Sequence, residues 1–156
     1  MNRWIALLFF LLASFTAAAI GGYATAESVR TWYPTLVKPS WNPPAVVFAP
    51  VWSLLYTAMS IAAWRSWLKR DRPGVPCTLR LFFVSLVLNA LWSVLFFGLH
   101  QPGWALLEVV LLWSTLVTLL VRFRRVDVIA GWLWAPYVAW VSFATALNAA
   151  IWWLNR

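Results

Sequence analysis

Residues 4–26, WIALLFFLLASFTAAAIGGYATA, make an apolar run that contains no charged side chain. Built as a helix with a rise of ~1.5 Å per residue, a run of this length crosses the ~30 Å hydrocarbon core of a bilayer. A segment surrounded by lipid has to satisfy its backbone hydrogen bonds internally, and a helix does so. The sequence therefore predicts a transmembrane helix over residues 4–26.

A second interpretation of this run is a cleaved secretory signal. Arg3 precedes the apolar stretch, and the small residues Ala24, Thr25 and Ala26 resemble a signal cleavage site. Cleavage would leave four helices. We favour a retained helix, because the run is longer than the roughly 7–15 apolar residues of a signal peptide.

Four further apolar runs follow at residues 45–68, 78–99, 104–121 and 128–154. Proline, glycine and charged residues separate them, as expected for breaks between helices. The chain is 63% hydrophobic and only 10% charged, which leaves too little polar surface for an additional soluble domain. The predicted fold is all-α, an integral membrane five-transmembrane-helix bundle made by a single domain over residues 1–156. Consecutive helices are expected to be adjacent and antiparallel.

The formal charge of +8 is distributed unevenly among the connections. Alternating helices would place nine basic residues on one side of the membrane and three on the other. The first side carries Arg3, Arg65, Lys69, Arg70, Arg72, Arg80, Arg122, Arg124 and Arg125, and the second carries Arg30, Lys38 and Arg156. The positive-inside rule then predicts a cytoplasmic N-terminus if the chain lies in an inner membrane. Basic residues scattered in this way form no single groove, which argues against nucleic acid as a partner.

The connection between the first two runs, residues 27–44, has an unusual composition. Its stretch RTWYPTLVKPSWNPP at residues 30–44 holds four prolines, which restrict the backbone. Trp32, Tyr33 and Trp41 add large apolar faces with polar groups. This composition is typical either of a lid packed over the mouth of the bundle or of an aromatic belt that anchors the loop at the membrane surface.

Short motifs in this loop and in the later runs resemble, in the same order, those of a known family. They are WY at 32–33, KPSWNPP at 38–44, PVWSLLY at 50–56, LNALW at 88–92, GWAL at 103–106 and PYVAWVSFATALN at 136–148. On these motifs the chain resembles the TspO/translocator protein family over essentially its whole length. The resemblance implies a five-helix membrane bundle, often a homodimer, with a pocket closed by the first loop. Bacterial members of this family are called tryptophan-rich sensory proteins.

The resemblance places the ligand pocket at ten residues of this chain. They are Tyr33, Pro43, Trp52, Tyr56, Asn89, Trp92, Trp140, Phe143, Ala144 and Leu147. Helical spacing is consistent with this set, because residues three, four or seven apart share a helix face. We expect Trp52 and Trp140 to stack on a planar ring, and Asn89 and indole N–H groups to orient a carbonyl or carboxylate. Spacing alone favours helix packing or contact with lipid over a ligand pocket, and the resemblance reverses this preference for Trp52 and Trp140.

The ligands implied by the resemblance are tetrapyrroles such as porphyrin or haem, with sterols and synthetic aromatic amides as further classes. Membrane lipid is the other expected contact. No required cofactor, catalytic residue or metal site is predicted, because Cys77 and His100 stand alone and no hydrolase or phosphate-binding motif occurs. Tyr137 has no Lys or Arg within the five following residues, which disfavours a sterol motif there. Glu108 lies inside an apolar run and is a functional candidate for that reason, but it is close enough to the connection at residues 100–103 to reach water, so we favour a structural role over a catalytic one.

Three functions remain open at this point. A receptor or sensor that sequesters tetrapyrrole is favoured over a transporter, because the chain lacks the inverted repeats of typical transporters. The third is a light-dependent porphyrin-degrading protein, in which Trp52 and Trp140 would be the oxidisable groups. We regard an enzymatic role as the weaker expectation, since the chain has only four acidic residues and one histidine.

Overall fold

The computed structural model describes residues 2–156 and contains five long helices, with no strand in that range. The helices are α1 (Arg3–Ala26), α2 (Phe48–Trp67), α3 (Val75–Ser93), α4 (Pro102–Val126) and α5 (Val128–Leu154). Short 3-10 turns at Tyr33–Thr35 and Ala45–Val47 shape the connection before α2. Each helix, with its flanking turns, is long and apolar enough to cross a membrane. The predicted five-helix membrane bundle is confirmed.

Local sequence signals explain where the helices begin. The Asn2 side chain accepts a hydrogen bond from the Trp4 N–H at 3.0 Å and caps α1. Pro76 and Pro102 stand in the first turns of α3 and α4, where a missing N–H costs nothing. Asp127 caps α5 by accepting from the Ala130 N–H at 2.9 Å.

Several helix bounds differ from the predicted ones. α2 begins at Phe48 after a 3-10 turn rather than at residue 45, and α4 begins at Pro102 rather than residue 104. The third helix begins at Val75 rather than residue 78 and closes with a π-helical turn over Val94–Gly98. The fourth helix continues to Val126 instead of ending at residue 121, and Arg124 and Arg125 occupy its last turn. Cations in that position interact favourably with the helix C-terminus, so charge marks the end of the apolar run but not the end of the helix.

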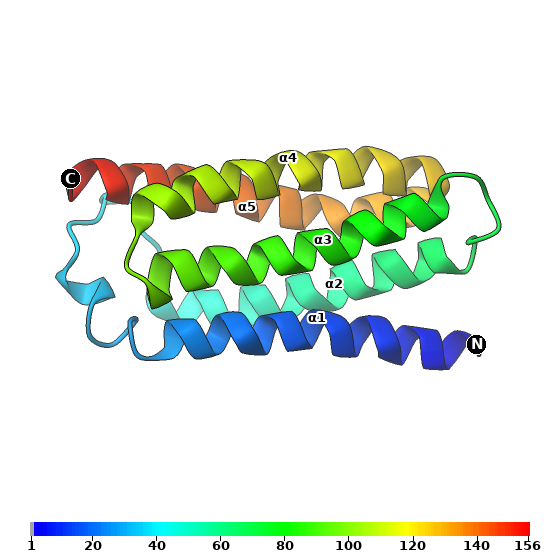
Figure 1. Cartoon of the computed structure of the whole chain (residues 1–156), viewed down its shortest axis with the longest axis horizontal. Coiled ribbons are helices and arrows are strands. Elements are labelled where there is room, and N and C mark those ends of the chain that lie inside the picture. The colour runs from blue at the N-terminus through cyan, green and yellow to red at the C-terminus, as the bar shows by residue number, and fades with distance from the viewer. Residues whose placement is uncertain (1) are drawn as a thin grey trace.

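The helices pack as a ring in the order α1, α2, α5, α4, α3 and back to α1. Their antiparallel arrangement places the N-terminus and the C-terminus at opposite ends of the molecule (Figure 1). The connection between α1 and α2 covers the end that also holds the C-terminus, and the loop between α2 and α3 lies at the other end (Figure 1). The bundle therefore has one end closed by a long loop and one end closed by short connections.

One expectation about neighbours was wrong. α2 and α3 are consecutive and antiparallel, but they lie on different sides of the ring and make few contacts. Residues 68–74 connect them, and seven residues reach up to about 23 Å when extended. That reach exceeds the ~8–10 Å between axes of packed helices, so the loop permits a non-adjacent pair.

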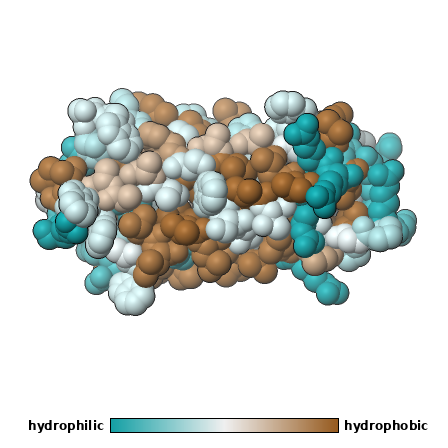
Figure 2. Space-filling model, turned by 90° about the horizontal axis from the view of Figure 1, so that it is seen from above, coloured by the Kyte–Doolittle hydropathy of each residue, from teal (hydrophilic) through white to brown (hydrophobic). Residues whose placement is uncertain are grey.

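The surface is divided as expected for a spanning bundle. Large apolar side chains are exposed along its sides, including Leu8, Leu54, Val87, Leu107 and Trp132. Figure 2 shows hydrophilic residues gathered most densely at the end where the N-terminus lies, away from the apolar middle of the bundle. The protein is an integral multi-pass membrane protein.

Candidate ligand-binding site

A cavity of about 670 Å³ lies between four helices and the loop over residues 27–44, which we call the lid. Its walls come from α1, α2, α3 and α5, and Val29, Arg30 and Tyr33 of the lid close one side. Small-molecule pockets usually enclose about 300–1,000 Å³ and are mainly apolar. The cavity has the size and lining of a ligand-binding site.

Seven of the ten predicted pocket residues line this cavity. They are Tyr33, Trp52, Tyr56, Asn89, Trp92, Trp140 and Ala144. Phe143 and Leu147 line an adjoining cavity of about 30 Å³, which shares Tyr33, Trp92, Trp140 and Ala144 with the large one.

Pro43 lines neither cavity, although we expected it to close the pocket together with Tyr33. Its carbonyl accepts a hydrogen bond from the Asn42 side-chain amide at 3.2 Å, and Asn42 in turn accepts from the Tyr33 hydroxyl at 2.7 Å. Pro43 is thus linked to the cavity through the lid backbone and Asn42, while Tyr33 covers the cavity directly.

Aromatic rings form two walls of the large cavity. On α2, the Trp52 and Tyr56 rings lie 5.6 Å apart between centroids with an interplanar angle of 31°. On α5, the Trp140 ring contacts Phe48 edge-to-face at 5.8 Å and Phe143 at 5.6 Å. These contacts fix the orientation of the indoles before any ligand arrives, which lowers the ordering cost of binding.

The polar residues of the cavity already have partners within the protein. The Tyr56 hydroxyl donates to the Asn89 side-chain oxygen, and the Asn89 amide donates to the Tyr137 hydroxyl at 2.8 Å. The Trp92 indole donates to Asn148 at 3.0 Å, and Asn148 donates to the Pro102 carbonyl at 2.8 Å. Asn89 and Trp92 therefore join α2, α3 and α5. The single indole N–H of Trp92 is used within the protein, whereas the Asn89 amide keeps one N–H that could orient a ligand.

Other donors face the cavity without a protein partner. The indole N–H groups of Trp52 and Trp140 make no hydrogen bond within residues 2–156. Among the described residues that line the cavity, Arg30 is the single charged one, and it makes no ion pair with them. Together with the Ser93 hydroxyl and the second N–H of the Asn89 amide, which have no partner within residues 2–156, these groups are donors available to a carbonyl or carboxylate.

The wall formed by α1 was missed by the sequence analysis. It consists of small residues at helical spacing together with one ring, namely Phe15, Ala18, Ala19, Gly21, Gly22, Thr25 and Ala26. A Cβ atom on Gly21 would lie 2.9 Å from the Ser93 hydroxyl, so glycine lets α1 approach α3 closely. The recurrence of small residues three and four apart was the available signal for this wall.

Two contacts attach the start of the lid to the turn after α3. The Ser28 hydroxyl donates to the Phe97 carbonyl and therefore accepts from the His100 Nε2–H at 2.9 Å. The His100 ring also stacks on Trp32 at 4.3 Å with an interplanar angle of 17°. His100 thus has a structural role in attaching the lid, and it does not line either cavity.

The middle of the lid is bound to the end of α5. The Val37 N–H donates to the Asn155 side-chain oxygen at 2.9 Å, and the Asn155 amide donates to the Val37 carbonyl at 2.9 Å and to the Ile151 carbonyl at 2.8 Å. Lys38 donates to the Tyr33 and Leu36 carbonyls at 2.8 Å each and so holds the lid in a compact turn. The lid is consequently an ordered cover rather than a flexible tether.

Replacing Asn155 by alanine is expected to raise the amide hydrogen-exchange rate of Val37 about 5–30-fold. The variant removes two exposed hydrogen bonds between lid and α5, worth roughly 1–2 kcal/mol together. Hydrogen-exchange mass spectrometry of the peptide over residues 31–44 measures the change. Arg156→Ala is the control, because Arg156 lies over the Trp153 ring and donates no hydrogen bond to the described lid residues. Equal exchange in all three proteins would show that the Asn155 contact does not hold the lid.

The sequence is similar to a known family and to several of its members. A model of the TspO/MBR family matches residues 9–154. The chain belongs to the TspO/MBR family. The resemblance of its motifs is thereby confirmed. This family member is 39% identical to the tryptophan-rich protein TspO of Chlorobaculum tepidum, with 99% of each chain covered. It is 36% identical to the human translocator protein over 96% of this chain and 89% of the human one. It is 35% identical to the tryptophan-rich sensory protein of Cereibacter sphaeroides over 93% of this chain and 88% of that one.

Glu108 lies on the inner face of α4 of this TspO/MBR family protein, where it is buried. Neither carboxyl oxygen has a hydrogen-bond partner within the described chain. Glu108 lines neither cavity, so the structure does not bring it together with the predicted pocket residues.

Proposed function

We propose that this protein is a membrane receptor that binds a flat, apolar ring system with an acidic substituent, a description that fits a tetrapyrrole such as protoporphyrin or haem. The observation that carries the proposal is a cavity of about 670 Å³ with tryptophans on two walls and a single cation, Arg30, among its described lining residues. Apolar walls with a few polar groups favour a ligand of the same composition.

The aromatic walls would supply most of the affinity. A macrocycle lying against Trp52 on α2 and Trp140 on α5 gains dispersion and loses water-exposed area on both faces. The unpartnered indole N–H groups add donors at the ring edge. The small side chains of Ala18 and Gly22 on α1 leave room on the remaining side, since a Cβ on Gly22 would meet nothing within 4 Å.

The experiment that tests this function is quenching of tryptophan fluorescence by protoporphyrin IX, corrected for optical filtering. Saturable quenching is expected for the wild type, with an affinity lowered by about 0.5–1.5 kcal/mol, roughly 2–10-fold, in Trp52→Phe and in Trp140→Phe. Trp104→Phe is the matched control, because Trp104 is 65% exposed on the outer surface of α4. Unsaturable quenching of equal slope in all four proteins would indicate partitioning into detergent or lipid and would reject the pocket.

Arg30 is expected to recognise the acid group of the ligand. Arg30→Gln should weaken binding of protoporphyrin IX about 5-fold, since one exposed charge-assisted hydrogen bond is worth roughly 1 kcal/mol. Binding of protoporphyrin dimethyl ester should be unchanged, because the ester carries no charge for Arg30 to pair with. Titration of both ligands against both proteins measures this difference, and equal losses for acid and ester would assign Arg30 a structural role.

Sequestration and transport are distinguished by a flux measurement. A receptor that holds its ligand under a lid tied at Ser28 and Asn155 binds porphyrin without moving it down a gradient. Proteoliposomes loaded on one side should therefore show binding but no protein-dependent flux. Gradient-dependent flux would instead support a transporter, and a new product that requires light and oxygen would support porphyrin degradation.

We further propose that the N-terminus faces the cytoplasm in an inner membrane. Nine basic residues belong to the end of the bundle that holds the N-terminus and three to the lid end, which agrees with the positive-inside rule. Reporter fusions to residue 156 would test this orientation, with an external reporter active at the C-terminus as the expected result.

A further inference from the structure

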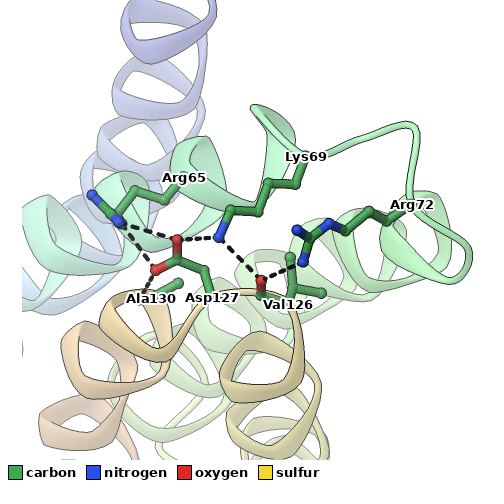
Figure 3. Close-up of polar contacts among 6 residues, drawn as sticks. All are labelled: Arg65, Lys69, Arg72, Val126, Asp127 and Ala130. Carbon is green, nitrogen blue, oxygen red and sulfur yellow. Dashed lines mark hydrogen bonds and ion pairs between the residues drawn. The ribbon is translucent and has the colours of Figure 1, made fainter.

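Two cations bind one carboxylate, and a third binds the neighbouring carbonyl, at the end of the bundle opposite the lid. The Arg65 Nε and Nη2 groups each donate to Asp127 at 3.1 Å, and the Lys69 ammonium donates to Asp127 at 2.6 Å. Lys69 also donates to the Val126 carbonyl at 3.2 Å, and Arg72 reaches the same carbonyl at 3.4 Å (Figure 3). The end of α2 and the loop after it are thus joined to the junction of α4 and α5.

This cluster holds more positive charge than its own carboxylate neutralises. Arg65, Lys69, Arg72 and Asp127 together carry a net charge of +2. Arg65 in the last turn of α2 and Lys69 in the turn after it bind the same carboxylate, so their like charges lie close together and repel. Of the donors, Arg65 Nη1 and the Nε and Nη2 groups of Arg72 have no partner in the part of the chain that the structure describes. A second anion would relieve the repulsion and fill these donors.

The ends of the spanning helices place the cluster where lipid headgroups are expected. α2 ends at Trp67, α4 ends at Val126 and α5 begins at Val128, so the cluster stands where three spanning helices meet the membrane surface. The Arg70 guanidinium lies over the Trp67 ring at 4.3 Å, an arrangement of aromatic and basic residues typical of the headgroup region. The anion available at this depth is the phosphate of a phospholipid.

We propose that Arg65, Lys69 and Arg72 bind the headgroup phosphate of an anionic phospholipid at this end of the bundle. Basic residues near the membrane surface attract anionic lipid by about 1 kcal/mol each. Arg122, Arg124 and Arg125 at the end of α4 add to the same positive field and form no ion pair within residues 2–156.

The lid end of the bundle offers no equivalent site. Lys38 there donates to lid carbonyls, and the Arg156 guanidinium lies over the Trp153 ring at 3.2 Å. Arg30 belongs to the ligand cavity. The proposed lipid site is therefore specific to one leaflet and is independent of the porphyrin site.

The test is a titration of the detergent-solubilised full chain with short-chain phosphatidylglycerol. The thermal unfolding midpoint, measured by tryptophan fluorescence at each lipid concentration, is the readout. Short-chain phosphatidylcholine and inorganic phosphate are titrated in parallel. We expect a saturable rise of the midpoint with phosphatidylglycerol alone. Arg72→Gln should lose at least half of that rise, and it should fold normally because its contact with the Val126 carbonyl is long.

Arg3→Gln is the matched control, since it makes the same charge change at the same end of the bundle outside the cluster. Retention of the full rise in this variant supports a localised site. If Arg3→Gln and Arg72→Gln lost equal parts of the rise, the lipid would be attracted by the overall positive charge and the proposal would be wrong. An equal rise with phosphatidylcholine would show that the charge of the headgroup does not matter, which would also overturn the proposal. An equal rise with inorganic phosphate would assign the cluster to a free ion. Native mass spectrometry of retained phosphatidylglycerol gives a second readout that does not depend on stability.

Discussion

Replacement of Asp127 by alanine is expected to lower the free energy of unfolding by about 2–4 kcal/mol. Removing one partner from a buried ion pair costs roughly 3–5 kcal/mol, and losing a helix N-cap costs about 1 kcal/mol. The ion-pair contribution is discounted here because the Arg65 and Lys69 side chains are 31% and 34% exposed, while Asp127 is 6% exposed. Reversible unfolding in mixed micelles titrated with a denaturing detergent measures the change.

Asp71→Ala is the control for this prediction, because Asp71 is exposed and makes no ion pair within residues 2–156. A loss of stability below about 1 kcal/mol in Asp127→Ala, or an equal loss in both variants, would show that the cluster does not join the helices. In that case water would hydrogen-bond to Arg65 and Lys69 once the carboxylate is removed.

The pH dependence of stability provides an independent check on Asp127. Burial by itself raises the pKa of this carboxyl, but hydrogen bonds from Arg65, Lys69 and the Ala130 N–H outweigh burial and hold the pKa well below its usual range. The folded pKa is therefore lower than the unfolded value of ~3.9. The stabilisation is complete above about pH 5 and is lost as the pH falls below about 4 through the folded pKa. The difference in the free energy of unfolding between wild type and Asp127→Ala should accordingly decrease as the pH falls below about 4.

The number of helices and their approximate positions follow from the sequence, because lipid imposes both length and apolar composition on a spanning helix. Residues 4–26 and 128–154 show this directly, since they agree closely with Arg3–Ala26 and Val128–Leu154. However, an apolar composition marks the part of a helix that lies in the hydrocarbon layer, and the helix itself can continue beyond it. α4 consequently extends five residues beyond the predicted end at 121, to Val126, through a basic turn that stands in the headgroup region.

The partners of polar groups could not be predicted from spacing. Asn89 and Trp92 share a face of α3, and that much is visible in the sequence. Whether the Asn89 amide faces a ligand or the Tyr137 hydroxyl depends on the order of helices around the ring, which connection lengths leave open. The same order brings Asn148 to Trp92. Helix faces were thus predictable from one sequence, whereas the pairing of those faces required the structure.

The lid shows the same division between composition and contacts. Four prolines and three aromatic residues between residues 30 and 44 predict an ordered loop. The bond between Val37 and Asn155 joins positions 118 residues apart, and no local pattern indicates it. Tyr33 lines the cavity while Pro43 does not, and Lys38 contacts both the carbonyl and the ring of Tyr33.

Ala144→Phe is expected to weaken porphyrin binding about 5–150-fold if the large cavity is the binding site. Ala144 lines both the large cavity and the small adjoining one, so a bulkier side chain there fills space between Trp140 and Trp92. Extra atoms in a packed site cost roughly 1–3 kcal/mol, which corresponds to the stated loss of affinity. Fluorescence quenching by protoporphyrin IX measures the dissociation constant.

Ala146→Phe provides the matched control, because Ala146 lies two residues further along α5 and is exposed on the outside of the bundle. It adds the same side chain without entering either cavity. Thermal unfolding of both variants separates blocked binding from a damaged fold, since only a folded Ala144→Phe protein tests the cavity. If the folded Ala144→Phe protein bound porphyrin as tightly as Ala146→Phe and the wild type, the ligand would occupy another surface. The aromatic rings around Trp140 would then serve to pack the lid onto α5, as the Trp41 ring does against Phe143 at 5.7 Å.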